Sequence, residues 1–467
     1  MMALVVRTLM QPGLVLCALT AAALSARAEP RVARSEGGDA YELNVQSHTY
    51  LELYQRALLP GPSGEIVVTD SVAPLYQHVA LRARALDLPF RRDSLDVELN
   101  AWGRLELAEP DGTQRLDGDL GAANVRYADE HLSLKLGRQH FAGGAARYVR
   151  FDGASGGARH ASGLGVEAYA GFSVPLPAYR RRGYLLLGAT PDSLVRNQDT
   201  YSGDDRGSSW LGGVRAFYER PSSHGASISF HEERRSGRLE RRNLGVDAHA
   251  GVTKSADLAA SAVLDIDAER FADVRAFADF FATEELDVGA EYLHAEPALL
   301  LSRQSVFSVF SSDQLDELGA RATLRVVRDI ELGGSAHFDR YDDGDVGSRA
   351  EVRTRFRPEG DGRLIVSLAY ARVLAPENGY HSARLALRQR LLRALTASAE
   401  AHYYVYDRNI LGYSSSSITA GTLEYLLQSD LALLWGASLA RSPYARLDAQ
   451  TVVRLSYELS LGEGRDR

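Results

Sequence analysis

The residues most suggestive of covalent chemistry are Gly153-Ala154-Ser155-Gly156-Gly157, which satisfy the pattern G-x-S-x-G. In serine hydrolases this pattern holds the nucleophile on a strained turn between a strand and a helix. Here three more glycines and a new alternating segment follow, so no helix is expected, and no aspartate can be paired with His160. We interpret the match as chance glycine spacing and predict that the protein is not an enzyme.

The sequence also contains no convincing metal-binding motif. The histidines are scattered, and H-E-x-x-H is absent from the sequence. Residues 339–345 contain Asp339, Asp342, Asp343 and Asp345, but they lack the ligand spacing and the closing glutamate of a calcium loop. An exposed acidic hairpin turn is the prediction here, with weak cation binding as the alternative. We therefore predict neither a cofactor nor a metal site.

The first residues indicate export. Arg7 precedes a short apolar run at residues 14–24, and Ala26-Arg27-Ala28 supplies small residues for a signal peptidase, so residues 1–28 are predicted to be a signal peptide. The only cysteine, Cys17, lies inside it. The mature chain therefore has no disulfide, and its stability must come from a large core or from a fully paired backbone.

From about residue 95 onward, apolar and polar residues alternate in runs of roughly ten, separated by turn residues. Residues 95–100 place Leu95, Val97 and Leu99 on one face and charged or amide side chains on the other. A period of two indicates strands that are apolar on one face and polar on the other.

Two architectures fit such strands in an exported chain: a soluble all-β protein and a transmembrane β-barrel. About ten residues is the length that a tilted strand needs to cross a bilayer. Isolated charges at mid-strand suit a wet lumen, and no repeat motif indicates a propeller or a solenoid. We predict an all-β fold, a closed antiparallel transmembrane β-barrel of roughly 16 to 22 strands with inward or external loops.

This prediction divides the chain into a signal peptide at 1–28, a barrel at 75–461 and a polar tail at 462–467. Residues 29–74 are either an N-terminal extension or the first strand. Residues 296–314 interrupt the alternation and are a constriction loop, an outer partner-binding loop or an irregular strand. The last strand carries Tyr457, Leu459 and Leu461 and then the polar tail, whereas outer-membrane barrels typically end in an aromatic residue.

This pattern of exported, cysteine-free, amphipathic strands resembles the bacterial outer-membrane β-barrels, and porins in particular. A more local resemblance is to alginate-export-type porins, in which a G-R-Q strand end is followed by a glycine-rich loop and F-D-G. The resemblance implies passage of solutes or acidic polysaccharide through the barrel. The matching residues are Gly137, Arg138, Gln139, Phe151, Asp152 and Gly153.

Candidate pore-lining residues follow from the polar faces of the strands and from the glycine-rich loop. We expect them to form one acidic and one basic arc, because strand order maps to position around a barrel wall; local pairing between neighbouring strands is the alternative. The acidic candidates are Asp265, Asp267, Asp273, Asp279, Asp287 and Glu291. The basic candidates on the later strands are Arg321, Arg325, Arg353, Arg355, Arg357, Arg384, Arg388 and Arg390. Four more are in or beside the loop, which is either a constriction or an outer loop: Arg138, Arg147, Arg150 and Arg159.

The function that these features predict is passage of hydrophilic, anionic solutes or polysaccharide across the outer membrane of a Gram-negative bacterium. The expected partners are outer-membrane lipid, lipopolysaccharide, the transported solutes and the barrel-insertion machinery. A net charge of −8 gives no reason to expect nucleic acid. The alternatives are a non-conducting scaffold barrel, an outer-membrane hydrolase and a soluble secreted protein; the oligomeric state is left open.

Overall fold

The protein divides into two compact units, Met1–Ala40 and Tyr41–Arg467, and the computed structural model describes residues of the second. The predicted signal peptide, most of 296–314 and nearly all of the C-terminal tail lie outside the described residues. The described ranges are 42–58, 67–87, 94–108, 116–174, 209–220, 224–296, 299, 314–342, 344–358, 363–376, 378–443 and 445–462.

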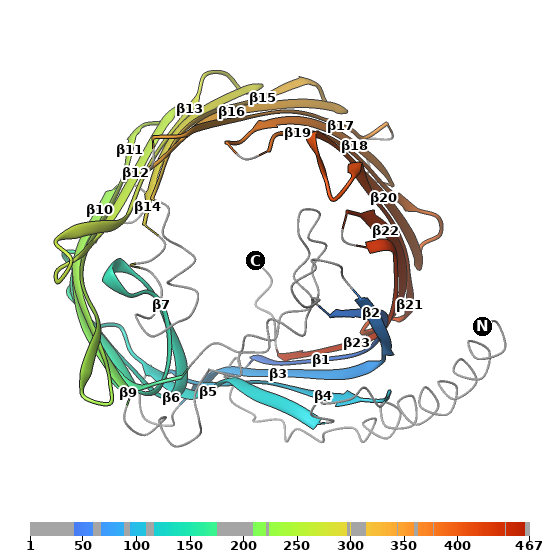
Figure 1. Cartoon of the computed structure of the whole chain (residues 1–467). Helices are drawn as coiled ribbons and strands as arrows, with labels where there is room; N and C mark the ends of the chain where they lie inside the picture. Colours follow the sequence, from blue (N-terminus) through green and yellow to red (C-terminus); the bar gives the residue numbers. More distant parts are fainter. Residues whose placement is uncertain are drawn as a thin grey trace. The chain divides into compact units, whose positions relative to one another are not determined.

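Nearly all described residues belong to strands, and apart from β2 and β3 each strand pairs antiparallel with the next (Figure 1). The first strands are β1 (Glu42–Leu58), β2 (Val67–Val72), β3 (Pro74–Asp87), β4 (Ser94–Glu106), β5 (Leu116–Ala128), β6 (Leu132–Gly143), β7 (Arg147–Arg159), β8 (Leu164–Ser173), β9 (Ser209–Arg220), β10 (His224–Arg235), β11 (Arg238–Thr253) and β12 (Ala256–Asp265). They are followed by β13 (Arg270–Phe281), β14 (Leu286–Ala295), β15 (Leu315–Val327), β16 (Ile330–Tyr341), β17 (Val346–Phe356), β18 (Leu364–Leu374), β19 (Tyr380–Arg390), β20 (Leu395–Ile410), β21 (Tyr413–Gln428), β22 (Leu431–Ser442) and β23 (Ala445–Gly462).

The sheet closes on itself through its first and last strands. β1 pairs with β23 from Glu42↔Gly462 to Tyr54↔Gln450. On its other side β1 pairs with β3 and then with the short β2, so these two strands, separated by Ala73, act as one neighbour of β1. The result is a closed antiparallel barrel of 22 strands, which confirms the predicted fold class. Closure pairs the strand edges, so the sheet has no open edge.

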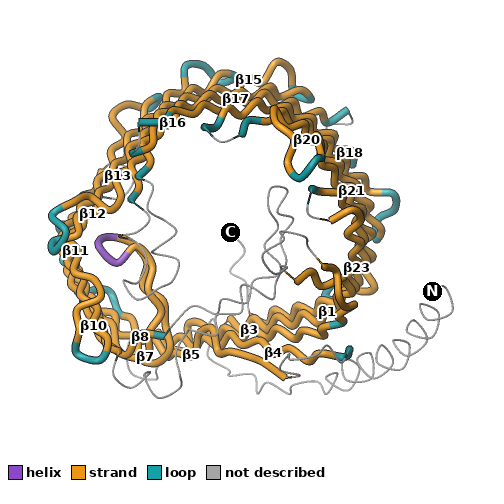
Figure 2. The backbone as a smooth tube through the Cα atoms, viewed as in Figure 1, coloured by secondary structure: helices purple, strands orange, loops and turns teal. Residues whose placement is uncertain are grey.

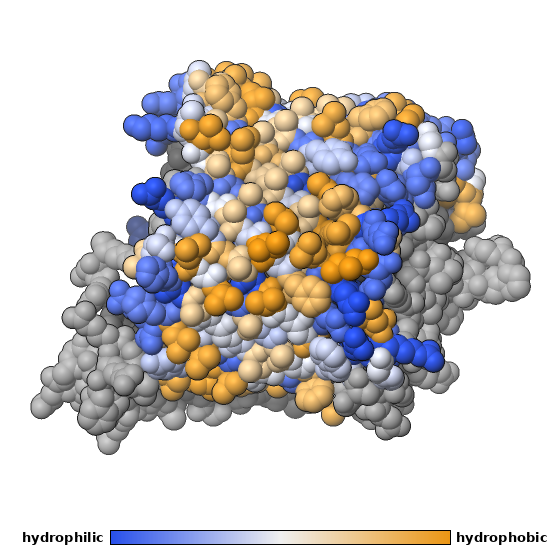
Figure 3. Space-filling model, turned by 90° about the vertical axis from the view of Figure 1, so that its left-hand side faces the viewer, coloured by the Kyte–Doolittle hydropathy of each residue, from blue (hydrophilic) through white to orange (hydrophobic). Residues whose placement is uncertain are grey.

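The period-two alternation separates an outer and an inner face. On β8, Leu164, Val166 and Phe172 are 57%, 46% and 54% exposed, while Tyr169 between them is buried. Figure 3 shows the resulting outer surface, an apolar band with hydrophilic residues at both ends of the strands. Such a band is typical of a surface that faces lipid. Among the described residues, no helix is long and apolar enough to span a membrane.

One hairpin leaves the wall. β6 and β7 are joined by a single 3-10 turn, η1 (Gly144–Ala146), which lies inside the ring of strands (Figure 2). Gly143 and Gly144, with φ of 110° and 56°, make the sharp turn that this tip requires. Beneath it is a small apolar core of buried residues: Ala146, Val149, Phe151, Tyr169 and Leu211.

Candidate functional site: the inner wall of the barrel

The tip of the β6–β7 hairpin is fixed to the inner wall by hydrogen bonds from both sides of its backbone. The amide of Ala145 donates to Ser229 Oγ of β10 at 2.7 Å, and Asn243 Nδ2 of β11 donates to the Ala145 carbonyl at 3.3 Å. A Cβ on Gly245 would lie 2.3 Å from the Ala145 nitrogen. Gly245 is therefore the residue that allows η1 to lie directly on the wall.

Arg147 anchors the same tip electrostatically. Its guanidinium donates to Asp273 Oδ1 at 2.5 Å and to Ser261 Oγ at 3.3 Å, and lies 3.6 Å from Asp247. Arg147 has φ of 55°, a left-handed conformation that costs an L residue of order 1–3 kcal/mol. The charged hydrogen bond to Asp273, which is fully buried, offsets this strain.

The base of the hairpin carries a second ion-pair group, centred on Asp119 of β5. Arg150 donates to Asp119 Oδ2 at 2.7 Å, and Arg138 lies 3.3 Å from Asp119 Oδ1. Arg138 also binds Asp152 through two parallel hydrogen bonds of 2.6 and 2.7 Å. The arginine and aspartate of the G-R-Q and F-D-G segments are thus paired with each other and hold β6 to β7.

Contacts with the inward hairpin identify which wall residues face the interior. Ser229, Asn243, Ser261 and Asp273 all touch the hairpin, and residues directly opposite on neighbouring strands share a face. The register carries this face onward around the wall. The inward residues include Asp279, Asp287, Glu291, Arg321, Arg325, His337, Arg353, Arg355, Arg384 and Arg388.

On β13 to β15 two of the acidic candidates are paired with two of the basic ones. Asp279, Gly289 and Arg321 lie opposite one another on three successive strands, and Arg321 reaches over the glycine to Asp279 Oδ1 at 2.5 Å. Arg325 of β15 lies 3.2 Å from Asp287 of the adjacent strand β14. On these strands, acidic and basic side chains therefore pair locally, which is the alternative to separate acidic and basic arcs.

Four arginines farther along the wall surround a strip of small side chains. Arg353, Ala369 and Arg384 form one cross-strand row on β17, β18 and β19, and Arg355 and Ser367 are opposite one another in the next. Arg388 lies farther along β19, opposite Ile365. Because β18 presents only small side chains in these two rows, the arginines are not covered from that strand. We call Arg353, Arg355, Arg384 and Arg388 the arginine patch.

The arginine patch carries more positive charge than its acidic neighbours balance. Arg384 lies 3.0 Å from Glu400 and Arg355 lies 3.7 Å from Glu331, with arginine side chains 53% and 49% exposed. Arg353 and Arg388 are exposed and make no ion pair with any residue in the described ranges. A solute with an anionic group would find guanidinium donors on both sides of the strip.

The remaining candidates lie at the strand ends. Asp267 is in the turn after β12, 3.7 Å from Arg242, and Arg159 ends β7, 3.7 Å from Glu219. Asp265 is buried, and its carboxylate accepts from the backbone amides of Asp267 and Ala268. Arg357 follows β17 and Arg390 ends β19.

The G-x-S-x-G residues lie within strand β7, which pairs with β6 and β8 on its two sides. Ser155 Oγ donates to Gln139 Oε1 at 2.6 Å. A strand continues on either side of the serine, so the strand-to-helix turn of a nucleophile elbow is not formed here. Ser155 instead joins β7 to β6.

Two inward residues that the sequence did not single out are Glu317 and His337, which join Glu291 in one cluster. These residues are brought together by the strand register, in which Glu291, Gly319 and His337 lie opposite one another on β14, β15 and β16. Sequence alternation assigns each residue to a face but does not give this alignment.

Comparison with known proteins finds matches among solved structures only. No protein-family model matches the sequence, and no curated protein matches it. Among solved structures the chain is similar to the outer membrane protein opdK from Pseudomonas aeruginosa, at 12% identity and a TM-score of 0.41, covering 90% of this chain and 99% of that one. It is likewise similar to P. aeruginosa OccK2 (OpdF) in complex with glucuronate, at 13% identity and a TM-score of 0.41, covering 90% and 98%. The P pilus usher (PapC) translocation pore matches at 10% identity and a TM-score of 0.45, covering 90% and 100%.

Proposed function

We propose that this barrel is an outer-membrane channel that passes small hydrophilic solutes bearing a carboxylate or similar anionic group. The arginine patch carries the proposal: two of its four guanidinium groups make no ion pair among the described residues, and all four face the barrel interior. Bidentate hydrogen bonds from arginine are well suited to carboxylates. The other inward candidates, including Arg321 and Arg325, would line the pore as paired charges and keep its wall hydrated.

Two further features support this role. The apolar outer band suits insertion of the barrel in a bilayer, with the polar inner face left to water. The β6–β7 hairpin, docked to β10, β11 and β13, takes up part of the interior on that side of the ring. In this proposal the hairpin narrows the passage and directs anionic solutes toward the opposite, arginine-bearing wall.

The proposal is tested by solute flux into liposomes that contain the refolded protein. Glucuronate and glucose have similar size and differ in charge, so their flux ratio isolates the electrostatic contribution. Reversing two charges with Arg353→Glu and Arg388→Glu should lower the glucuronate-to-glucose ratio by about tenfold, the factor given by 1.4 kcal/mol of lost attraction.

The matched control is Arg220→Glu with Arg340→Glu. This pair changes the net charge equally, but both residues occupy outward positions in the register, near strand ends. The control should leave the ratio unchanged. An unchanged ratio in the patch variant, with glucose flux intact, would show that the patch does not select the solute; no flux of either solute through the wild type would contradict a channel altogether.

A further inference from the structure

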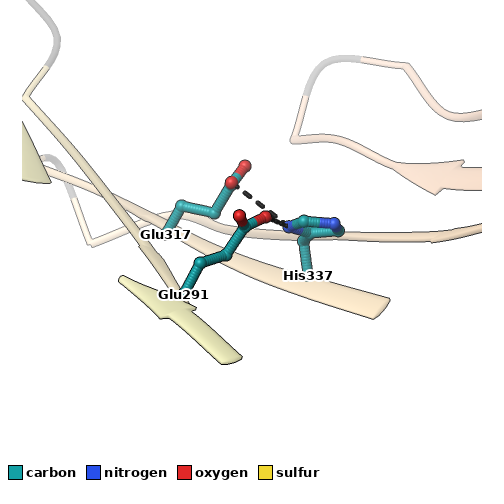
Figure 4. Close-up of side chains that lie close together, drawn as sticks. All are labelled: Glu291, Glu317 and His337. Carbon is teal, nitrogen blue, oxygen red and sulfur yellow. Dashed lines mark hydrogen bonds and ion pairs between the residues drawn. The ribbon is translucent and has the colours of Figure 1, made fainter. Parts of the chain in front are cut away.

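Three inward side chains from successive strands meet at one point of the wall (Figure 4). Nδ1 of His337 on β16 lies 3.3 Å from Glu291 Oε1 of β14 and 3.2 Å from Glu317 Oε1 of β15. One ligand atom from each residue lies within 4.8 Å of the other two. The side chains of His337 and Glu317 are only 8% and 14% exposed, while that of Glu291 is 26% exposed.

Gly319 is the reason that side chains two strands apart can meet. It lies on β15 between Glu291 and His337 in the same cross-strand row. A Cβ at this position would lie 2.6 Å from His337 Nδ1 and 2.8 Å from Glu291 Cγ. The absence of a side chain therefore creates the space in which the carboxylates and the imidazole converge.

The cluster has an excess of negative charge. Asp339 is directly opposite Glu317 in the register and faces the same side, and its Oδ1 is buried without a hydrogen-bond partner. Among the described residues, the ion pairs to Glu291 and Glu317 come from His337 and Arg349, the latter at 3.1 Å from Glu317 Oε2. Three carboxyl groups thus face one arginine and one imidazole, and Arg321, the other arginine near Glu291, is already paired with Asp279. Such a group favours a bound cation.

We propose that Glu291, Glu317 and His337 bind a divalent transition-metal ion of the zinc class. Zinc–nitrogen and zinc–oxygen bonds of about 2.0–2.2 Å in a tetrahedron require ligand atoms about 3.3–3.6 Å apart, close to the two distances from His337 Nδ1. The imidazole ligand favours zinc, cobalt or nickel over calcium or magnesium. The exposed side of Glu291 leaves room for water as the fourth ligand.

In this site His337 would coordinate through Nδ1 as the neutral imidazole. The ion would also link β14, β15 and β16 through their side chains. The inference does not depend on the proposed transport function, because it concerns a different part of the wall.

Binding of Co²⁺ to the full-length mature barrel, refolded in detergent, provides the test, because tetrahedral Co²⁺ absorbs visible light. We expect one equivalent to bind and Zn²⁺ to displace it. His337→Gln and, separately, Glu317→Gln should each weaken binding more than tenfold, because even indirect changes around a metal weaken it by about 10- to 100-fold. Both substitutions are close in size to the native residues, and the heat-dependent gel migration of folded barrels checks each variant.

Two further variants separate a metal site from a structural ion-pair group. Arg349→Gln frees Glu317 Oε2 and should tighten Co²⁺ binding several-fold, whereas a merely structural role would make this variant less stable with no gain in binding. His402→Gln is the matched control, because His402 pairs with only one carboxylate, that of Glu400. This variant should bind Co²⁺ as tightly as the wild type does. Failure of the wild type to bind Co²⁺ or Zn²⁺, or equal binding by folded His337→Gln, would overturn the proposal.

Discussion

Gly289 and Gly319 let charged side chains interact across an intervening strand of this barrel. Over Gly289, Arg321 reaches Asp279; over Gly319, His337 reaches Glu291. Directly opposite residues on adjacent strands are about 4.5–5.5 Å apart, so a pair two strands apart is separated by roughly 10 Å of backbone. A side chain in the middle would block the contact, and a glycine removes that obstacle.

Gly319→Ala should therefore weaken Co²⁺ binding more than Gly289→Ala does. The new methyl group at 319 would lie 2.6 Å from His337 Nδ1, which must move away from Glu291. Gly289→Ala is a control of equal crowding, since its Cβ would lie 2.6 Å from Arg321 Nε and 2.7 Å from Asp279 Oδ1. Equal affinities in the two variants, measured by Co²⁺ absorbance titration, would contradict the role given to Gly319.

At the scale of elements, the β6–β7 hairpin is the part whose tip lies inside the ring of strands. Its tip is held by backbone hydrogen bonds at Ala145 and by the ion pair of Arg147 with Asp273. The sequence indicated a glycine-rich loop after Gln139, either a constriction or an outer loop, whereas β6 continues to Gly143 and residues 147–159 form strand β7. The sequence could not identify the docking position of the hairpin, because Ser229 and Asp273 lie 84 and 126 residues away from their partners.

Arg147→Gln should loosen the docked hairpin. A hydrogen bond to a charged group contributes about 1.5–3 kcal/mol, and its loss should increase the fraction of time that the tip is detached from the wall. We expect larger mean conductance and more current noise in planar bilayers. Arg159→Gln, at the exposed far end of the same hairpin, is the control and should conduct as the wild type does. A wild-type current trace from Arg147→Gln would show that the ion pair does not hold the hairpin.

At the scale of the whole molecule, closure of the sheet depends on the pairing of its first and last strands. Ser47 of β1 and Tyr457 of β23 are directly opposite. Their Cα atoms are therefore about 4.5 or 5.5 Å apart, within the range that a disulfide spans. The mature chain offers no competing thiol, because Cys17 precedes the predicted cleavage site.

Oxidation of a Ser47→Cys, Tyr457→Cys variant should therefore produce a crosslink, detected by non-reducing electrophoresis. Ser47→Cys with Ser415→Cys is the control, because Ser415 lies on β21, separated from β1 by two strands. A crosslink in the control and none in the opposed pair would contradict the closed register.

The alternation of apolar and polar residues determines which features of the fold could be predicted from the sequence. A period of two assigns a face to each residue, so the all-β class, the closed barrel and the inward arginines of β17 and β19 could be anticipated. Register depends on turns and on the pairing of distant strands, which alternation does not specify. Hence the pairing of Arg321 with Asp279 and the meeting of His337 with Glu317 and Glu291 emerge only from the folded chain.

The central claim is that the barrel interior conducts and that the arginine patch influences which ions pass. The most direct test is the single-channel reversal potential in a planar bilayer across a KCl gradient. We predict discrete conductance steps and, for Arg353→Glu with Arg388→Glu, a shift toward cation selectivity that the outward pair Arg220→Glu with Arg340→Glu does not produce. A barrel that passes no current, or a reversal potential identical in both double variants, would contradict the account.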